Sequence, residues 1–188
     1  VVTVNQPAVA LGTPKTEFFY NAQGQPTKVV DPNGLVTQMT YFPTTGYLQT
    51  VARDPLGINA ATQFVYDNFG NVIQITDPNT RVSSFVYNEL GWLINSTNAL
   101  TRKVKYTYDA NGNVIKEEKQ SNAAASTWQT TLYTYDVFNH VLTVKDALNR
   151  VTTLAYDFNE NLVTRKDAKG NATTYLYDER NLLFKVTD

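Results

Sequence analysis

The stretch YDNFGNVIQITDPNTRVSSFV, residues 66–86, is followed directly by YNELGWLINSTNALTRKVKYT, residues 87–107, and then by a third Tyr-Asp pair. Tyr66, Tyr87 and Tyr108 therefore stand 21 residues apart, and a glycine follows each of them four residues later. Self-similarity at a fixed period of this length is the signature of a repeat architecture, in which each repeat is one supersecondary unit. The sequence therefore predicts an array of short tandem units.

The same spacing extends over most of the chain. Eight marker tyrosines define eight units, of which we expect the last to be truncated: Tyr20, Tyr41, Tyr66, Tyr87, Tyr108, Tyr135, Tyr156 and Tyr177. Two steps are longer, 25 residues from Tyr41 to Tyr66 and 27 residues from Tyr108 to Tyr135. We interpret the first as two small loop insertions and the second as a longer exposed loop in the polar stretch 120–129.

Two further positions recur in phase with the tyrosines and predict turns. A glycine stands four residues after four of the eight markers: Gly24, Gly70, Gly91 and Gly112. Aspartates recur about half a period later: Asp31, Asp54, Asp77, Asp146, Asp167 and Asp188. An aspartate can cap its own turn by accepting backbone N–H bonds, whereas glycine or asparagine tolerates the positive φ that a tight turn needs.

The segments between these turns alternate as strands do. A large apolar or aromatic residue precedes the marker by two positions, as Phe64 and Phe85 do, and pairs such as Val72-Ile73 follow the turn. Short turns at both ends of each strand predict an antiparallel meander. The expected fold is all-β, with tandem antiparallel β-hairpin repeats of about 21 residues forming a long curled sheet. Residues 1–15 are expected to be a lead-in segment and residues 16–188 the array.

Composition excludes several classes of protein. The formal net charge is −1 and the charges are interspersed, which argues against binding to nucleic acid. The chain contains no cysteine, so disulfides and thiolate chemistry are excluded. No apolar stretch approaches the roughly 20 residues of a membrane span, and the N-terminus does not resemble a signal peptide. Because the chain also lacks an initiator methionine and stops within a repeat, we expect it to be a piece of a longer protein.

No residue pattern predicts chemistry. The spaced aspartates lack the dense arrangement of a calcium loop, and His140, which we interpret as replacing the turn glycine of its unit, is expected to be a turn residue. We predict no catalytic residue, no metal site and no cofactor. The candidate ligand-binding residues are Trp92 and Trp128, whose indole rings can stack on sugars if exposed.

The phased pattern YDxxGNVxxxxDPNxxxxxFxYN resembles the YD repeat, also called the RHS (rearrangement hotspot) repeat. The match is strongest at Tyr66-Asp67, at Gly70-Asn71-Val72 and at Asp77-Pro78-Asn79. The resemblance implies a place in large secreted or surface proteins, such as bacterial polymorphic toxins, shell-forming subunits of insecticidal toxin complexes, wall-associated proteins and teneurins. In that family a long β-strip spirals into a hollow shell that can hold a toxic C-terminal domain. The plug region of such shells and its self-cleaving aspartates have no counterpart here, so no catalytic residue is carried over.

The expected function is that of a non-enzymatic structural module, a spiral β-shell segment that helps to encapsulate a toxin or effector domain in a secreted or surface bacterial protein. Its expected partners are the rest of a longer parent chain and its toxin cargo. The alternative is an adhesin-like surface module that binds carbohydrate or protein, with a glycan or cell-surface ligand as its partner. The two alternatives differ in whether the tryptophans bind a ligand or only pack.

Overall fold

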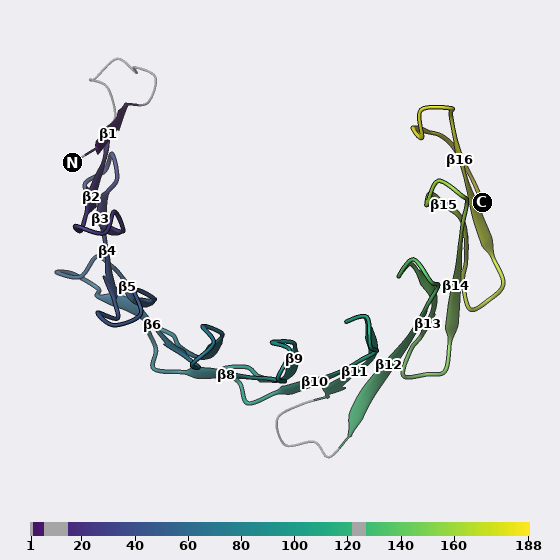
Figure 1. Cartoon of the computed structure of the whole chain (residues 1–188), viewed down its shortest axis with the longest axis horizontal. Helices are drawn as coiled ribbons and strands as arrows, with labels where there is room; N and C mark the ends of the chain where they lie inside the picture. Colours follow the sequence, from purple (N-terminus) through teal and green to yellow (C-terminus); the bar gives the residue numbers. More distant parts are fainter. Residues whose placement is uncertain (1, 6–14, 122–126) are drawn as a thin grey trace. The chain divides into compact units, whose positions relative to one another are not determined.

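The computed structural model describes residues 2–5, 15–121 and 127–188, and every regular element within these ranges is a β-strand (Figure 1). Among the described residues, the strands that pair are antiparallel and are neighbours in the chain. The predicted all-β class and its organisation into tandem hairpins are therefore confirmed.

The chain divides into two compact units, residues 1–86 with 98–100 and residues 87–97 with 101–188. The strands of the first unit are β1 (Val2–Asn5), β2 (Lys15–Tyr20), β3 (Pro26–Val30), β4 (Val36–Tyr41), β5 (Leu48–Arg53), β6 (Ala60–Tyr66), β7 (Val72–Thr76) and β8 (Val82–Tyr87), whose last residue already lies in the second unit. Those of the second unit are β9 (Leu93–Thr97), β10 (Lys103–Tyr108), β11 (Val114–Gln120), β12 (Trp128–Tyr135), β13 (Val141–Lys145), β14 (Val151–Tyr156), β15 (Leu162–Lys166), β16 (Ala172–Tyr177) and β17 (Leu183–Thr187).

The 21-residue period corresponds to two turns and two strands. After Tyr66 come a turn at 67–71, the five residues of β7, a turn at 77–81 and the six residues of β8, which ends on the next marker tyrosine. Each marker tyrosine is thus the last residue of its strand. The hairpin that closes after it contains a β-bulge, because the register shifts between the residue before the marker and the marker itself, as between Val65 and Tyr66.

The two longer steps are built differently from the prediction of loop insertions. Between Tyr41 and Tyr66, β5 has six residues and β6 has seven, so the surplus is shared between strands and turns. Between Tyr108 and Tyr135, β11 has seven residues and β12 has eight. Part of the stretch 120–129 is therefore strand, and residues 122–126 lie outside the described ranges. A strand can lengthen by pairing further along its neighbour, and composition alone does not distinguish this from a longer loop.

In the segment expected as a lead-in, Val2–Asn5 form β1 and pair antiparallel with β2, from Val2 opposite Phe18 to Asn5 opposite Lys15. This strand was not foreseen, because the proline and glycine residues that follow it favoured a linker. Residues 6–14 lie outside the described ranges.

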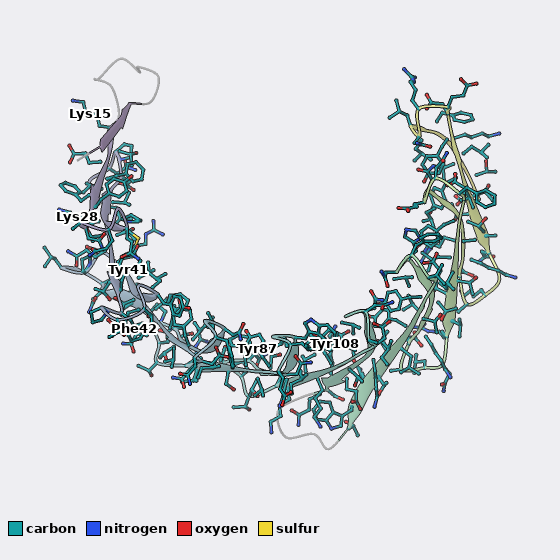
Figure 2. All side chains as sticks on the ribbon, viewed as in Figure 1. Lys15, Lys28, Tyr41, Phe42, Tyr87 and Tyr108 are labelled. Carbon is teal, nitrogen blue, oxygen red and sulfur yellow. The ribbon has the colours of Figure 1, made fainter. Side chains whose placement is uncertain are left out.

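Each unit is a single layer of strands. Among the described residues no side chain is buried in a core, and the strands that contact one another are neighbours in the chain. The two faces nevertheless differ, since in β10 the side chains of Val104, Tyr106 and Tyr108 are half-buried while those of Lys103 and Lys105 are exposed. Side chains stand on the ribbon of both units, with no second layer of strands over them within either unit (Figure 2). The marker tyrosines thus lie on the better-covered face.

Candidate functional surface

Each regular turn is a loop that begins with an aspartate or an asparagine. In the turn after Tyr66, Oδ1 of Asp67 accepts hydrogen bonds of 2.9 Å from the backbone N–H groups of Phe69 and Asn71. Its Oδ2 accepts a third, also 2.9 Å, from the side-chain amide of Asn71. Gly70, at φ 88°, completes the loop by donating its N–H to the carbonyl of Asp67. The aspartate therefore accepts hydrogen bonds from backbone N–H groups of the turn that are not used in the pairing of the strands.

Most of the aspartates that were predicted at turns take this first position. They accept the same pair of backbone bonds in their own loops: Asp31, Asp77, Asp146 and Asp167. Asp54 differs, because it has φ 50° itself and its side chain accepts a bond of 3.3 Å from the N–H of Ile58. Asp188 lies after the last strand, where it accepts a bond of 2.8 Å from the hydroxyl of Thr173.

A second set of turn aspartates was missed by the sequence reasoning. These residues directly follow the marker tyrosines and cap the bulged hairpins: Asp67, Asp109, Asp136, Asp157 and Asp178. The signal was available, because Asn21 and Asn88, which can accept the same bonds, occupy the position elsewhere. The pKa of the Asp109 carboxyl is lowered by the side-chain amide of Asn113 and by backbone N–H donors, although partial burial opposes this.

The positive φ that the turn demands is found at the predicted glycines, Gly24, Gly70, Gly91 and Gly112, and in later units at Asn139, Glu160 and Asn181. The interpretation of His140 as the residue that replaces the turn glycine is wrong. Asn139 holds that place with φ 69°, and His140 is the fifth and last residue of the loop. The error is one of register, since either residue could follow a turn of this length.

The hydroxyl groups of the marker tyrosines join neighbouring strands. Each of five donates to a backbone carbonyl at the start of the preceding strand: Tyr41 to Pro26 at 2.7 Å, Tyr108 to Leu93 at 2.7 Å, Tyr135 to Val114 at 2.8 Å, Tyr156 to Val141 at 3.1 Å and Tyr177 to Leu162 at 3.0 Å. Burial raises the pKa of Tyr108 and of Tyr156 above the ordinary value.

The last residue of one turn reaches the residue before the last in the next marker turn. Where the last residue is an amide, the contact is a hydrogen bond, as from Gln25 to the carbonyl of Gly46 at 2.8 Å and from Asn113 to Oδ1 of Asn139 at 2.7 Å. The same holds from Asn161 to Oδ1 of Asn181 at 3.0 Å. Where it is aromatic, the ring packs instead. Consecutive hairpins are thus joined along one edge, by contacts between residues about one period apart.

Trp92 is the last residue of the turn at 88–92 and is one of the aromatic residues in this position. Its ring lies 5.2 Å from the ring of Tyr108 at 45°, and it covers Gly112 so closely that a Cβ there would meet the indole at 3.0 Å. Tyr47 repeats the arrangement in the first unit, 5.0 Å from Tyr66 and over Gly70. The half-buried indole of Trp92 is therefore packed against the next hairpin, which leaves less of it free to stack on a sugar.

Trp128 begins β12 beside the residues that lie outside the described ranges. Nζ of Lys105 lies 4.5 Å from the centre of its ring, a cation–π contact on the face opposite to the marker tyrosines. A cavity of about 150 Å³ lies next to it, lined also by Thr130, Leu132 and Lys145. The structure does not bring Trp92 and Trp128 into contact, so they are two separate candidate sites for a sugar.

Two larger hollows lie between marker turns, each beside an aromatic residue at the end of a turn. In the second unit the ring of His140 stacks on Tyr156 at 4.7 Å and 28°, and a cavity of about 500 Å³ opens beside them. In the first unit a cavity of about 320 Å³ lies beside Tyr47 and Tyr66. Neither hollow was predicted, because each is formed by residues from two consecutive repeats.

These features define a class of protein, the tandem β-hairpin repeat in which capped turns and tyrosine hydroxyls hold a single-layered sheet together. Two segments, residues 20–58 and 87–125, match the family model of the RHS repeat. The predicted resemblance to the RHS repeat is therefore confirmed at these two segments.

Solved structures that contain TcdB2-TccC3 share the fold. The chain is similar to the crystal structure of TcdB2-TccC3 without its hypervariable C-terminal region, with TM-score 0.64 and 14% identity over 92% of this chain. It is also similar to TcdB2-TccC3-Cdc42, with TM-score 0.56 and 14% identity over 92% of this chain. The chain spans 11% and 13% of the length of those proteins. No curated protein sequence matches the chain significantly. Within residues 2–5, 15–121 and 127–188, the structure has no helix that is long and apolar enough to span a membrane.

Proposed function

We propose that the chain is a non-enzymatic wall segment of a β-shell, within a longer secreted or surface bacterial polypeptide that encloses a toxin or effector domain. The observation that carries the proposal is the single-layered sheet, in which none of the described side chains is buried in a core. A sheet of this kind leaves both faces to be covered by other polypeptide or by solvent, which is what a wall requires. The fold shared with TcdB2-TccC3 supports the same conclusion.

The chemistry of the turns supports a structural role. The carboxylates that recur along the array accept hydrogen bonds within their own loops, as Asp67 and Asp77 do. General acid–base catalysis by a carboxylate needs a group whose proton can exchange with a substrate. The repeated residues are thus engaged in holding the sheet, and the proposed function assigns them no reaction.

A test of enclosure uses the natural polypeptide that contains this segment. Val144 lies in the middle of β13, paired with Tyr133 on one side and Thr152 on the other. Val144→Pro removes a backbone donor and breaks the wall at that strand. The control is Ala147→Pro, because Pro78 already occupies the equivalent position of the turn at 77–81.

The measurement is limited proteolysis followed by mass spectrometry of the fragments. We expect the enclosed domain to survive in the natural protein and in Ala147→Pro, and to be digested in Val144→Pro. Equal digestion of that domain in all three proteins would show that this wall encloses nothing.

A further inference from the structure

The hollow in the second unit has aromatic walls from two neighbouring marker turns. Phe138 and His140 come from the turn after β12, and Tyr156 and Phe158 from the end of β14 and the turn that follows it. The ring of Phe138 lies 6.2 Å from that of His140, which stacks on Tyr156. Phe138 is 68% exposed and Phe158 is fully exposed, so their faces are open to a ligand. A cavity of about 500 Å³ is large enough for the end of a long side chain.

The charge of the side chains that line this hollow is negative. Asp136, Asp157 and Glu160 line it, and no lysine or arginine is among its lining residues. Two of the carboxylates are engaged, Asp136 with His140 at 3.0 Å and Asp157 with Asn161 at 3.1 Å. Glu160 differs, because its side chain is 65% exposed and its carboxylate lies 3.6 Å from Nε2 of His140, beyond a normal hydrogen bond. The hollow therefore offers one accessible carboxylate beside open aromatic faces.

We propose that this hollow binds the guanidinium group of an arginine presented by a partner peptide. A guanidinium is planar and positively charged, stacks on aromatic faces and pairs with a carboxylate through two parallel bonds. The phenyl rings of Phe138 and Phe158 supply the stacking surface, and Glu160 supplies the acceptor. The proposal does not depend on the proposed function, since an arginine-bearing partner could be cargo or another protein.

The first unit contains a matched hollow that serves as an internal control. It lies beside Tyr47 and Tyr66, with a volume of about 320 Å³ and Phe42 in its wall. Its lining includes one carboxylate, Asp67, whose two oxygens are already bonded to Asn71. The aromatic surface is similar, but Asp67 is the one carboxylate among the lining residues and it is engaged within its own turn, so we expect this hollow to bind no guanidinium.

The test is an NMR titration of the 188-residue chain with the peptide acetyl-Gly-Arg-Gly-amide. Acetyl-Gly-citrulline-Gly-amide is the comparison ligand, because citrulline has the same shape without the charge. We expect the arginine peptide to shift the signals of His140, Tyr156 and Phe158 and to leave those of Tyr47 and Tyr66 unchanged. The citrulline peptide should leave both sets unchanged.

Two variants assign the interaction to its residues. Glu160→Gln should weaken binding about two- to fivefold, the range expected for an exposed ion pair. Glu179→Gln makes the same charge change outside the hollow and should have no effect. Phe158→Leu should also weaken binding about two- to fivefold through loss of the cation–π contact, and since Phe158 is fully exposed the fold should not change.

Several results would overturn the proposal. These are the absence of shifts, equal shifts with citrulline, shifts confined to the hollow of the first unit, or unchanged affinity in both Glu160→Gln and Phe158→Leu. A neutral saccharide that shifted these signals when the arginine peptide did not would also overturn it.

Discussion

The hydroxyl of Tyr108 donates a hydrogen bond of 2.7 Å to the backbone carbonyl of Leu93, fifteen residues earlier and on the neighbouring strand. The pairing of β9 with β10 stops at Asn95 opposite Lys105, before it reaches the marker turn. The tyrosine hydroxyl therefore satisfies a carbonyl beyond the end of the ladder. This contact explains why the repeated residue is tyrosine rather than phenylalanine.

The first prediction follows from that contact. Tyr108→Phe keeps the ring and removes the donor, so we expect a loss of about 0.5–1.5 kcal/mol in the free energy of unfolding. The measurement is urea denaturation followed by circular dichroism. The control is Tyr20→Phe, because Tyr20 is 46% exposed and no hydrogen bond of its hydroxyl is found within the described residues. Equal effects of the two variants would show that the bond to Leu93 adds no stability.

A second prediction concerns backbone strain in the turn at 77–81. Thr80 has φ 63°, a conformation that is unfavourable for a β-branched residue. Asn149 holds the equivalent position in the turn at 146–150 with φ 62°, where asparagine is tolerated. We expect Thr80→Asn to raise the free energy of unfolding by about 0.5–1 kcal/mol.

The reciprocal variant, Asn149→Thr, is its control and should lower the free energy of unfolding by a similar amount. Thermal and urea unfolding of both variants check the pair. If Thr80→Asn were neutral or destabilising, the positive φ of Thr80 would not be a source of strain.

Much of the fold could be predicted from the sequence because each turn is defined locally. Asp77 and Pro78 fix a loop through contacts within five residues, and the spacing of the tyrosines counts the hairpins. The β-bulge before Tyr66 and the lengthening of β11 and β12 were not predictable in this way. They depend on how two strands align, and a shift in alignment leaves the composition unchanged.

The candidate surface was harder to predict for the same reason. The contact of Trp92 with Tyr108 and the hollow beside His140 join residues about one period apart, which no local pattern specifies. The tryptophans are candidate ligand-binding residues in the sequence because they are rare, large aromatic residues. Their packing against Gly112 and Lys105 could only be seen once the hairpins were placed side by side.

A third prediction concerns acid. The pKa of the Asp67 carboxyl is lowered by the side-chain amide of Asn71 and by backbone donors, and that of Asp77 is lowered by Arg81. A carboxyl whose pKa is lower in the folded state stabilises the fold at pH values above its unfolded pKa, about 3.9, and this stabilisation is lost as the pH falls through the folded value. We expect the thermal midpoint to be nearly constant between about pH 5 and 8 and to fall below about pH 4.

The control for the acid prediction is an uncharged turn already present in the chain. In the turn at 21–25, Nδ2 of Asn21 donates to Oε1 of Gln25 at 2.8 Å, in place of an aspartate–asparagine pair. The double variant Asp67→Asn with Asn71→Gln copies this pair, and we expect it to reduce the acid dependence. A thermal midpoint that rose as the pH was lowered from about 5 to about 3 would contradict the prediction, because it would mean that the folded state binds more protons than the unfolded state.

The last prediction separates packing from ligand binding at Trp92. Because the indole covers Gly112 and lies against Tyr108, Trp92→Ala should lower the free energy of unfolding by about 1–3 kcal/mol, less than for a fully buried aromatic.

Gly112→Ala should also destabilise, since its Cβ would lie 3.0 Å from the indole and Gly112 has φ 89°. The double variant Trp92→Ala with Gly112→Ala relieves the collision but not the backbone strain. We therefore expect its loss to be smaller than the sum of the two single losses. Additive losses in this cycle, measured by urea denaturation, would show that the two residues do not interact. A Trp92→Ala protein with unchanged stability that lost binding to a glycan would identify the indole as a ligand-binding residue instead.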